Sequence, residues 1–302
     1  MAKGRAGCKP LAVHGSPERD LDSRALWPMS GPMLSRTLAL FGALAALAVP
    51  SAARAEMVED VVAARILPGW RLADGTHLAG LEFTLAEGWK TYWRAPGDAG
   101  IPPSFDWSGS GNLAGVAISW PVPEIFDQNG MRSIVYGDRV VLPLHVRPAR
   151  DGADVRLTAQ IDLGVCEDIC IPAEVAVSGL LPADARRPDP AIAAALAARP
   201  YSAEEAGVTS VRCTVVPEAD GLGLRVEIEM PGAAGVEGAV IETADPEVWV
   251  SEPVLAAEAG RLTATSLLVH VEEGAFALDR SGVRVTLLNG GTGVDIRGCG
   301  PR

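Results

Sequence analysis

The chain is short of positive charge, and this shortage excludes two classes of partner. Its 302 residues include 26 lysines and arginines against 38 aspartates and glutamates, so the formal net charge at pH 7 is −12. Nucleic acids and anionic membrane surfaces are both bound through a basic footprint. We therefore expect neither as a partner, and we interpret the acidity as a feature that favours solubility.

The sequence also lacks the motifs of several catalytic and cofactor-binding classes. It has no Gly-x-Ser-x-Gly elbow, and only His77, His145 and His270 follow residue 55, so a Ser/His/Asp hydrolase has little support. Glycine-rich phosphate loops and dinucleotide fingerprints are absent as well. None of the three histidines lies within 20 residues of Cys166 or Cys170, which argues against a zinc site at these cysteines. We expect no cofactor and no dedicated metal site.

No apolar run of the sequence is long enough to cross a membrane. Residues 38–49 form an apolar run of twelve, whereas a membrane-spanning helix needs about 20. A basic start at Met33–Arg36 and a small-x-small site at Ala53–Ala55 flank this run, which is the pattern of a secretory signal peptide. We therefore expect residues 1–55 to be removed by cleavage after Ala55, and the remaining chain to be soluble in the periplasm.

The rest of the chain predicts two β-sandwich domains of immunoglobulin-like type. Residues 56–182 alternate short apolar runs with glycine, proline and aspartate, which is typical of an all-β domain. The same pattern resumes in residues 208–302. Between them, residues 183–207 are predicted to be a linker with one short helix, because Asp189 can cap a helix that begins at Pro190. The predicted fold class is all-β.

Cys166 and Cys170 stand at the expected neck of a hairpin, between an alternating run that ends at Asp162 and another at Glu174–Val177. A step of four residues across such a neck is compatible with a disulfide. A bridge this short closes a very small loop, so it stabilises a fold less than a long-range bridge does. Strained, exposed short bridges are also the most readily reduced. On these residues alone, a structural clip and a redox-active pair are equally open.

Cys213 and Cys299 lie near the two ends of the second predicted domain. A disulfide between them would close a loop of about 85 residues, which is worth roughly 4.5 kcal/mol in the chain-entropy model. We expect this pair to form a structural disulfide.

Three motifs in the first predicted domain resemble a known family. They are Gly88–Gly100 (GWKTYWRAPGDAG), Ile134–Leu144 (IVYGDRVVLPL) and Cys166–Pro172 (CEDICIP). In this order they resemble the periplasmic amino-terminal region of thiol:disulfide interchange proteins of the DsbD and ScsB type. The ScsB branch, named for suppression of copper sensitivity, is the more similar. The surroundings of Cys213 and Cys299 also resemble the ScsB-type region.

The resemblance implies a redox shuttle with an immunoglobulin-like fold. In the family, this region takes electrons from a membrane-embedded partner through its cysteine pair and passes them to periplasmic disulfide proteins. Cys166 and Cys170 match that pair, although the spacing in DsbD itself is longer. The chain contains neither the membrane domain nor the thioredoxin-like domain of DsbD, so we expect the membrane-embedded thiol-disulfide electron donor to be a separate protein. The expected acceptors are periplasmic thioredoxin-like or disulfide-containing proteins.

The resemblance also suggests which side chains cover the pair. Residues 124–131 correspond to the family's loop over the cysteines, so we expect Phe126 or Met131 to shield them. The adjacent carboxylates of Glu167 and Asp168 should disfavour a thiolate, because they raise the cost of a further negative charge. We therefore expect a thiol that stays unreactive until a partner docks.

Two further residues belong to a strand motif that the resemblance places near the cysteines. Tyr92 could support the pair or simply pack in the core, which is the commoner role of an aromatic residue in a sandwich. Arg94 could pair with Asp98 as a brace of the loop, or stabilise a thiolate. The sequence does not decide between these roles.

We therefore predict a two-domain periplasmic protein that performs thiol-disulfide exchange through Cys166 and Cys170. The alternative is a non-catalytic periplasmic binding module with two structural disulfides, for example one that acts in copper stress. The redox potential of the pair separates the two: an active pair equilibrates with glutathione, whereas a structural bridge resists reduction down to below roughly −300 mV.

Overall fold

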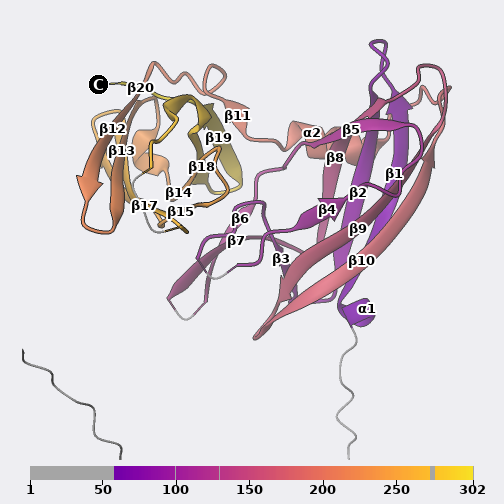
Figure 1. Ribbon diagram of the computed structural model, residues 1–302, viewed down its shortest axis with the longest axis horizontal. Helices are drawn as coiled ribbons and strands as arrows, with labels where there is room; N and C mark the ends of the chain where they lie inside the picture. Colours follow the sequence, from indigo (N-terminus) through magenta and orange to yellow (C-terminus); the bar gives the residue numbers. More distant parts are fainter. Residues whose placement is uncertain (1–57, 99, 129, 273–275, 302) are drawn as a thin grey trace, which may run out of the picture. The chain divides into compact units, whose positions relative to one another are not determined.

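The computed structural model describes residues 58–98, 100–128, 130–272 and 276–301. Within these ranges the chain consists of β-strands with a few short helices, which confirms the all-β prediction (Figure 1). The strands form four sheets, and the sheets make up two immunoglobulin-like sandwiches. The predicted upstream extension and signal peptide, which together make up residues 1–55, lie outside the described residues.

The first sandwich uses strands from residues 62–181 only. Its four-stranded sheet has the order β1-β2-β8-β5, with strands β1 Val62–Arg71, β2 His77–Leu85, β5 Leu113–Ile118 and β8 Arg139–Pro148. Its six-stranded sheet has the order β10-β9-β3-β7-β6, with β4 paired to β9. The strands of that sheet are β3 Lys90–Tyr92, β4 Ser104–Asp106, β6 Glu124–Gln128, β7 Met131–Gly137, β9 Val155–Cys166 and β10 Cys170–Leu181.

The second sandwich uses strands from residues 201–301. Its four-stranded sheet has the order β11-β19-β18-β14, with strands β11 Tyr201–Ser202, β14 Gly238–Glu242, β18 Arg284–Asn289 and β19 Thr292–Arg297. Its six-stranded sheet has the order β15-β17-β13-β12-β20, with β16 paired to β17. The strands of that sheet are β12 Ser210–Glu218, β13 Gly221–Glu229, β15 Val248–Val250, β16 Val254–Glu258, β17 Arg261–His270 and β20 Gly300–Pro301.

Helical structure is limited to short segments. The α-helices are α1 Val58–Val61 and α2 Pro190–Ala197, and the 3₁₀ turns are η1 Ala233–Gly235 and η2 Arg280–Gly282. As predicted, Asp189 caps α2: its carboxylate accepts hydrogen bonds from the backbone of Ala191 and Ile192 at 2.8 and 3.2 Å. No helix in the described part of the chain is long and apolar enough to span a bilayer.

The segment between the two sandwiches contributes to the second one. Strand β11 falls inside residues 183–207, the range predicted as a linker, and pairs in parallel with β19. Helix α2 packs against the first sandwich through Ile192, which is fully buried beside Leu67 and Val141. The boundaries of the predicted domains, after residue 182 and before residue 208, remain a prediction.

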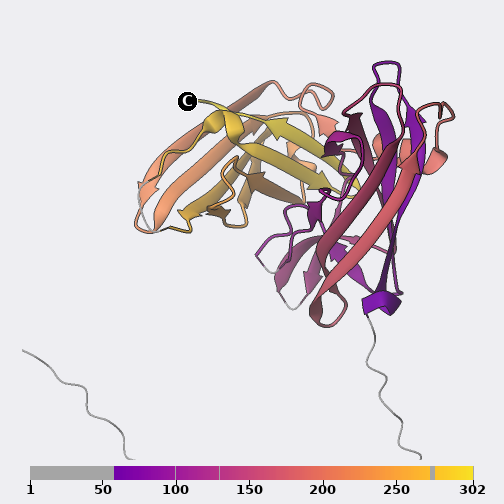
Figure 2. The same cartoon turned by 45° about the vertical axis from the view of Figure 1, so that its right-hand side comes forward.

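Strands β9 and β10 form a long hairpin that carries both cysteines of the first sandwich. They run side by side over twelve residues each, and Figure 2 shows the same hairpin from a second direction. Along β9 the residues Val155, Leu157, Ala159 and Ile161 are buried and their neighbours are more exposed, which is the alternation of a strand with one face on a core. The hairpin therefore forms because its period-2 pattern matches one buried face.

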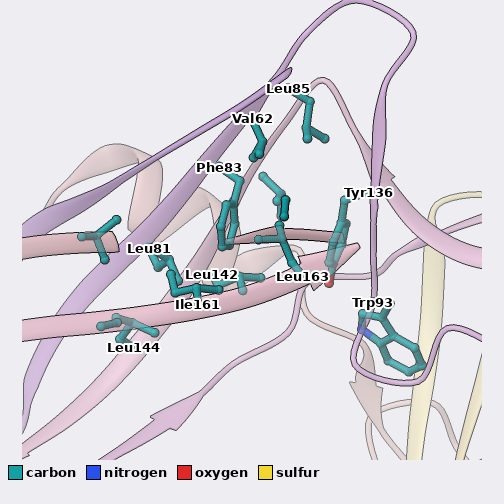
Figure 3. Close-up of a cluster of buried hydrophobic side chains, with 14 of the residues drawn as sticks. Val62, Leu81, Phe83, Leu85, Trp93, Tyr136, Leu142, Leu144, Ile161 and Leu163 are labelled. Atoms are coloured by element: carbon teal, nitrogen blue, oxygen red, sulfur yellow. The ribbon is translucent and has the colours of Figure 1, made fainter. Parts of the chain in front are cut away.

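Each sandwich has its own main hydrophobic cluster. The first packs Leu81, Phe83, Leu142 and Leu144 against Ile161 and Leu163, with Trp93 and Tyr136 at its side (Figure 3). The second is built on β13 and β17, where Leu224, Val226, Ile228 and Leu262 are fully or almost fully buried. These cores hold the strands in register and so determine which residues face outward.

Candidate functional site

The register of the β9–β10 hairpin places Cys166 directly opposite Cys170. The Cα atoms of the two cysteines lie 4.2 Å apart, and a disulfide joins them. Three residues, Glu167, Asp168 and Ile169, form the loop between the strands, and all three are exposed. The bridge therefore closes the end of the hairpin, at the neck where the sequence pattern predicted it.

The two cysteines differ in their exposure to solvent. Cys166 is buried, with 6% of its surface exposed, whereas Cys170 is exposed. The loop residue Ile169 is 68% exposed. Cys170 is therefore the more exposed residue of the pair, while Cys166 is covered by the strands around it.

The strands next to the hairpin bring further side chains to the same face of the sheet. Lys90 on β3 lies directly opposite Cys166, and Tyr92, two residues on, lies opposite Val135 on β7. Alternate residues of a strand share a face, so the disulfide and these side chains are grouped together. A hollow on this face is lined by Lys90, Tyr92, Phe126, Met131, Ser133, Val135, Cys166 and Cys170.

The intervening residues point to the other face of the same sheet. Ile134, Tyr136 and Val165 are buried in the main core of the first sandwich. Thr91 is buried as well, and its hydroxyl donates to the backbone oxygen of Gly164 at 2.9 Å. The site is thus on the outer face of a sheet whose inner face is held by the core.

Tyr92 contacts the disulfide directly. Its side chain is buried, and its hydroxyl donates a hydrogen bond to Cys170 Sγ at 2.9 Å. Burial raises the pKa of the Tyr92 hydroxyl, so the group stays protonated and remains a donor. Two glycines make room for the ring: a Cβ at Gly164 would lie 2.7 Å from Tyr92 Cδ2, and one at Gly100 would lie 2.8 Å from Tyr92 Cδ1.

Phe126 on β6 and Met131 at the start of β7 both line the hollow that contains the cysteines. Phe126 is half-buried and packs against a small cluster formed by Tyr92, Val135 and Cys166. Met131 is 58% exposed and lines the hollow from its outer side. Of the two shielding candidates, Phe126 therefore has the closer packing on the pair.

Lys90 is a residue of the site that the sequence analysis missed. Its ammonium group lies 4.3 Å from the centroid of the Phe126 ring and donates to the backbone oxygen of Gly88 at 3.0 Å. The sequence does contain a signal, because Lys90 is the only lysine after Lys9. This rarity points to the site only once the register of β3 against β9 is known, because that register places Lys90 opposite Cys166.

Residues 62–182 match the family described as thiol:disulfide interchange protein DsbD, N-terminal. These residues form a DsbD-type amino-terminal domain. A solved structure, the N-terminal periplasmic domain of ScsB from Proteus mirabilis, is also similar, with a TM-score of 0.55 and 23% sequence identity. The alignment covers 79% of this chain and 92% of that chain, and at this identity it shows the fold alone. No protein with a curated function matches the chain.

The match confirms the resemblance that the sequence motifs indicated. The DsbD-type domain contains both Cys166 and Cys170, and it ends just after β10. The family model that it matches is that of a thiol:disulfide interchange protein.

Arg94, which follows the Tyr92 strand of the DsbD-type domain, has other partners than those predicted. Its guanidinium donates to both carboxylate oxygens of Glu242, at 3.1 and 2.8 Å, and to the hydroxyl of Thr286 at 3.2 Å. It also stacks on the ring of Trp93, 3.7 Å from the centroid. Burial lowers the pKa of Arg94, and the Glu242 carboxylate opposes this effect. The ion-pair partner of Arg94 is therefore Glu242, 148 residues further along the chain, and not Asp98 or a cysteine thiolate.

Cys213 and Cys299 are joined by a disulfide that differs from the one in the DsbD-type domain. Cys213 is 1% exposed on β12, and Cys299 is half-buried and packs against the core of the second sandwich. The bridge spans 86 residues and links strand β12 to the carboxyl-terminal segment of the chain. Its burial and span are those of a structural disulfide.

Three potential metal ligands gather in the second sandwich rather than near the DsbD-type cysteines. Ligand atoms of Asp245, Glu247 and His270 lie within 4.8 Å of one another. The His270 ring nitrogen is 3.8 Å from Asp245 and 3.6 Å from Glu247, and both carboxylates are exposed. Exposed acidic residues around a histidine are common as weak ion pairs, and we assign this group no part in the exchange chemistry.

Proposed function

We propose that this protein is a thiol-disulfide interchange protein that relays electrons through Cys166 and Cys170. One observation carries the proposal: the disulfide at the end of a hairpin joins an exposed residue, Cys170, to a buried one, Cys166. The family of the DsbD-type domain supports the same chemistry. A purely structural bridge would gain little from closing so small a loop.

The geometry favours Cys170 as the sulfur that a partner attacks. A partner thiolate forms a bond to Cys170, the bond between the two cysteines breaks, and Cys166 leaves as a thiolate. The second thiolate of the partner then attacks its own sulfur in the mixed disulfide and releases Cys170 as a thiolate. The partner becomes a disulfide, the pair gains two electrons, and each of its sulfurs can take one proton from water.

Tyr92 and Phe126 have distinct roles in this scheme. The Tyr92 hydroxyl, which donates to Cys170 in the oxidised state, is placed to stabilise negative charge on that sulfur when the mixed disulfide resolves. Phe126 packs on the small cluster that contains Cys166, so it limits access to the buried sulfur. Together they favour attack by a partner thiolate at Cys170 over attack at Cys166.

We place the protein in the periplasm, between a membrane-embedded reductant and periplasmic disulfide proteins. The similar ScsB structure is named as a periplasmic domain, and two disulfides suit an oxidising compartment. The predicted signal peptide supports the same location. Electrons would enter from the membrane partner's dithiol and leave to an acceptor disulfide by the same exchange in reverse.

A glutathione titration of the full chain tests the proposal, with the thiols counted by alkylation at each potential. We expect Cys166 and Cys170 to equilibrate at about −180 to −270 mV, and Cys213 and Cys299 to stay oxidised below about −300 mV. The second disulfide thus serves as an internal control. If both disulfides resisted reduction to the same potential, the protein would be a binding module with two structural bridges.

Trapping of the partner completes the test. Cys166→Ser leaves Cys170 without its internal partner, so a mixed disulfide formed at Cys170 should accumulate in a periplasmic extract. Cys170→Ser leaves only the buried Cys166 and should trap much less. Failure of both variants to form any mixed disulfide would contradict the relay.

A further inference from the structure

We propose that Lys90 is a positioning residue of the exchange reaction, whose ammonium group stabilises the thiolate of Cys166 as that sulfur leaves the disulfide. This inference rests on the proposed function, in which Cys170 is attacked and Cys166 departs. The other groups near the departing thiolate are the hydroxyls of Tyr92 and Ser133, two carboxylates of the β9–β10 loop and apolar side chains. None of these carries positive charge, so a nearby cation has a specific task.

The sheet register brings Lys90 and Cys166 together. They are directly opposed residues of the antiparallel strands β3 and β9, and the Cβ atoms of such residues lie about 4.5–5.5 Å apart on one face. Cys170 is directly opposed to Cys166 on the other side. Lys90, Cys166 and Cys170 therefore form one row across three strands, and all three line the same hollow.

Two contacts hold the ammonium group at this hollow. The nitrogen lies over the ring of Phe126 and donates to the backbone oxygen of Gly88. Phe126 itself packs on the cluster that contains Cys166, so its ring keeps the lysine on the cysteine side of the strand. An ammonium group has three rotatable donors, which leaves donors free to turn toward a sulfur that becomes charged.

The choice of lysine at this position stands out against the rest of the chain. Of 26 basic residues, 23 are arginines, and Lys90 is the one lysine after Lys9. Arginine suits planar, bidentate pairing with carboxylates, as Arg94 shows with Glu242. A lysine is a compact point charge, which suits a single sulfur atom that carries charge only during the reaction.

The other titratable groups near the pair do not supply positive charge. Tyr92 comes from the same strand as Lys90 and contacts Cys170. Glu167 and Asp168 come from the loop between β9 and β10, and a Glu167 oxygen lies close to Gly88. The residues that line the hollow from β6 and β7, such as Phe126, carry no titratable group. Lys90 is thus the cation of the hollow, placed to offset the acidic loop.

The test uses the full chain with Cys8→Ser and Cys170→Ser, which leaves Cys166 as a single free thiol and keeps the disulfide of the second sandwich. The formation of the Cys166 thiolate is followed against pH by absorbance at 240 nm and by the rate of alkylation. Addition of Lys90→Met should move the titration up by about one pH unit, and Lys90→Arg should restore it. Arg156→Met is the matched control, because it removes one positive charge ten residues along β9, about 33 Å away.

A second readout uses the intact disulfide. Reduction of Cys166–Cys170 by dithiothreitol should be about threefold slower in Lys90→Met and unchanged in Arg156→Met, because a less stable thiolate is a poorer leaving group. If Lys90 acted only by holding Phe126, Lys90→Met would speed alkylation at every pH without moving the titration, and the proposal would be overturned. An unchanged titration and rate would overturn it as well. Neither readout needs a protein partner, so the result is independent of whether the relay itself is found.

Discussion

The two disulfides should differ sharply in what they contribute to stability, and the difference can be worked out from their loops. The Cys213–Cys299 bridge spans 86 residues and the Cys166–Cys170 bridge spans four. In the chain-entropy model these spans correspond to about 4.5 and about 2 kcal/mol of stabilisation. Replacing each pair by alanines should therefore destabilise the second sandwich by about 2.5 kcal/mol more than the first.

Packing adds to this difference. Each pair has one buried cysteine, with Cys166 6% exposed and Cys213 1% exposed. Cys299 is half-buried and packs on the core, whereas Cys170 is exposed, so the loss of packing is larger in the second sandwich and acts in the same direction as the loop length. Alanine is a better replacement than serine, because it adds no buried polar group.

Native-state hydrogen exchange followed by mass spectrometry can measure the two sandwiches separately, because strand amides exchange through opening of their own unit. In the variant without Cys213 and Cys299, protection of β12, β13 and β17 should fall on the order of 10³-fold, while β2 and β9 stay unchanged. In the variant without Cys166 and Cys170, protection of β9 should fall by ~30-fold at most.

Equal losses in the two variants would refute the reasoning, because the loop lengths would then not determine the contribution of each bridge. A larger loss in the first sandwich would also do so, and would make Cys166–Cys170 the structural bridge. The predicted order is therefore a second, independent argument on which disulfide is free to open during function.

Two further predictions concern the cover of the site and the response to acid. Phe126→Ala should speed alkylation of the reduced pair severalfold, because the ring packs on the cluster around Cys166, and an unchanged rate would end the shielding idea. Hydrogen bonds from Arg199 and from the Ser202 backbone lower the pKa of Glu205 from 4.5 to about 2. Its depressed pKa adds stability above pH 4.5 that is lost as the pH falls toward 2. In urea unfolding, the free energy of unfolding of Glu205→Gln should thus be lower than that of the native chain at pH 6 and match it near pH 2. A difference in stability that persisted near pH 2 would exclude the Glu205 charge as its cause.

Much of the site could be predicted because its central feature is local. Cys166 and Cys170 are four residues apart, and the alternating runs on either side specify the register of the hairpin that opposes them. The expected segment 124–131 also reaches the cysteines, since Phe126 and Met131 both line the hollow. The roles of these residues in exchange stay predictions until the experiments above are done.

Other parts of the site depend on strands that meet from distant positions. The hydroxyl of Tyr92 and the sulfur of Cys170 are 78 residues apart in the sequence, and the local pattern allowed a plain core role for this tyrosine. Lys90 has no local feature that assigns it to Cys166, because β3 has only three residues and its register is set by both neighbours. The sequence left the role of Arg94 open for the same reason, because its partner Glu242 lies 148 residues away.

The sequence by itself determined the class of fold, the cap of α2 at Asp189 and the hairpin that carries the disulfide. Each of these follows from patterns within about a dozen residues, where the alternation of apolar side chains and the capping chemistry act directly. Only the tertiary structure decided that Cys170 is exposed and Cys166 buried, and that Tyr92, Phe126 and Lys90 surround them. Those facts depend on which strands become neighbours, and this is settled when the whole sheet packs its inner face on one core.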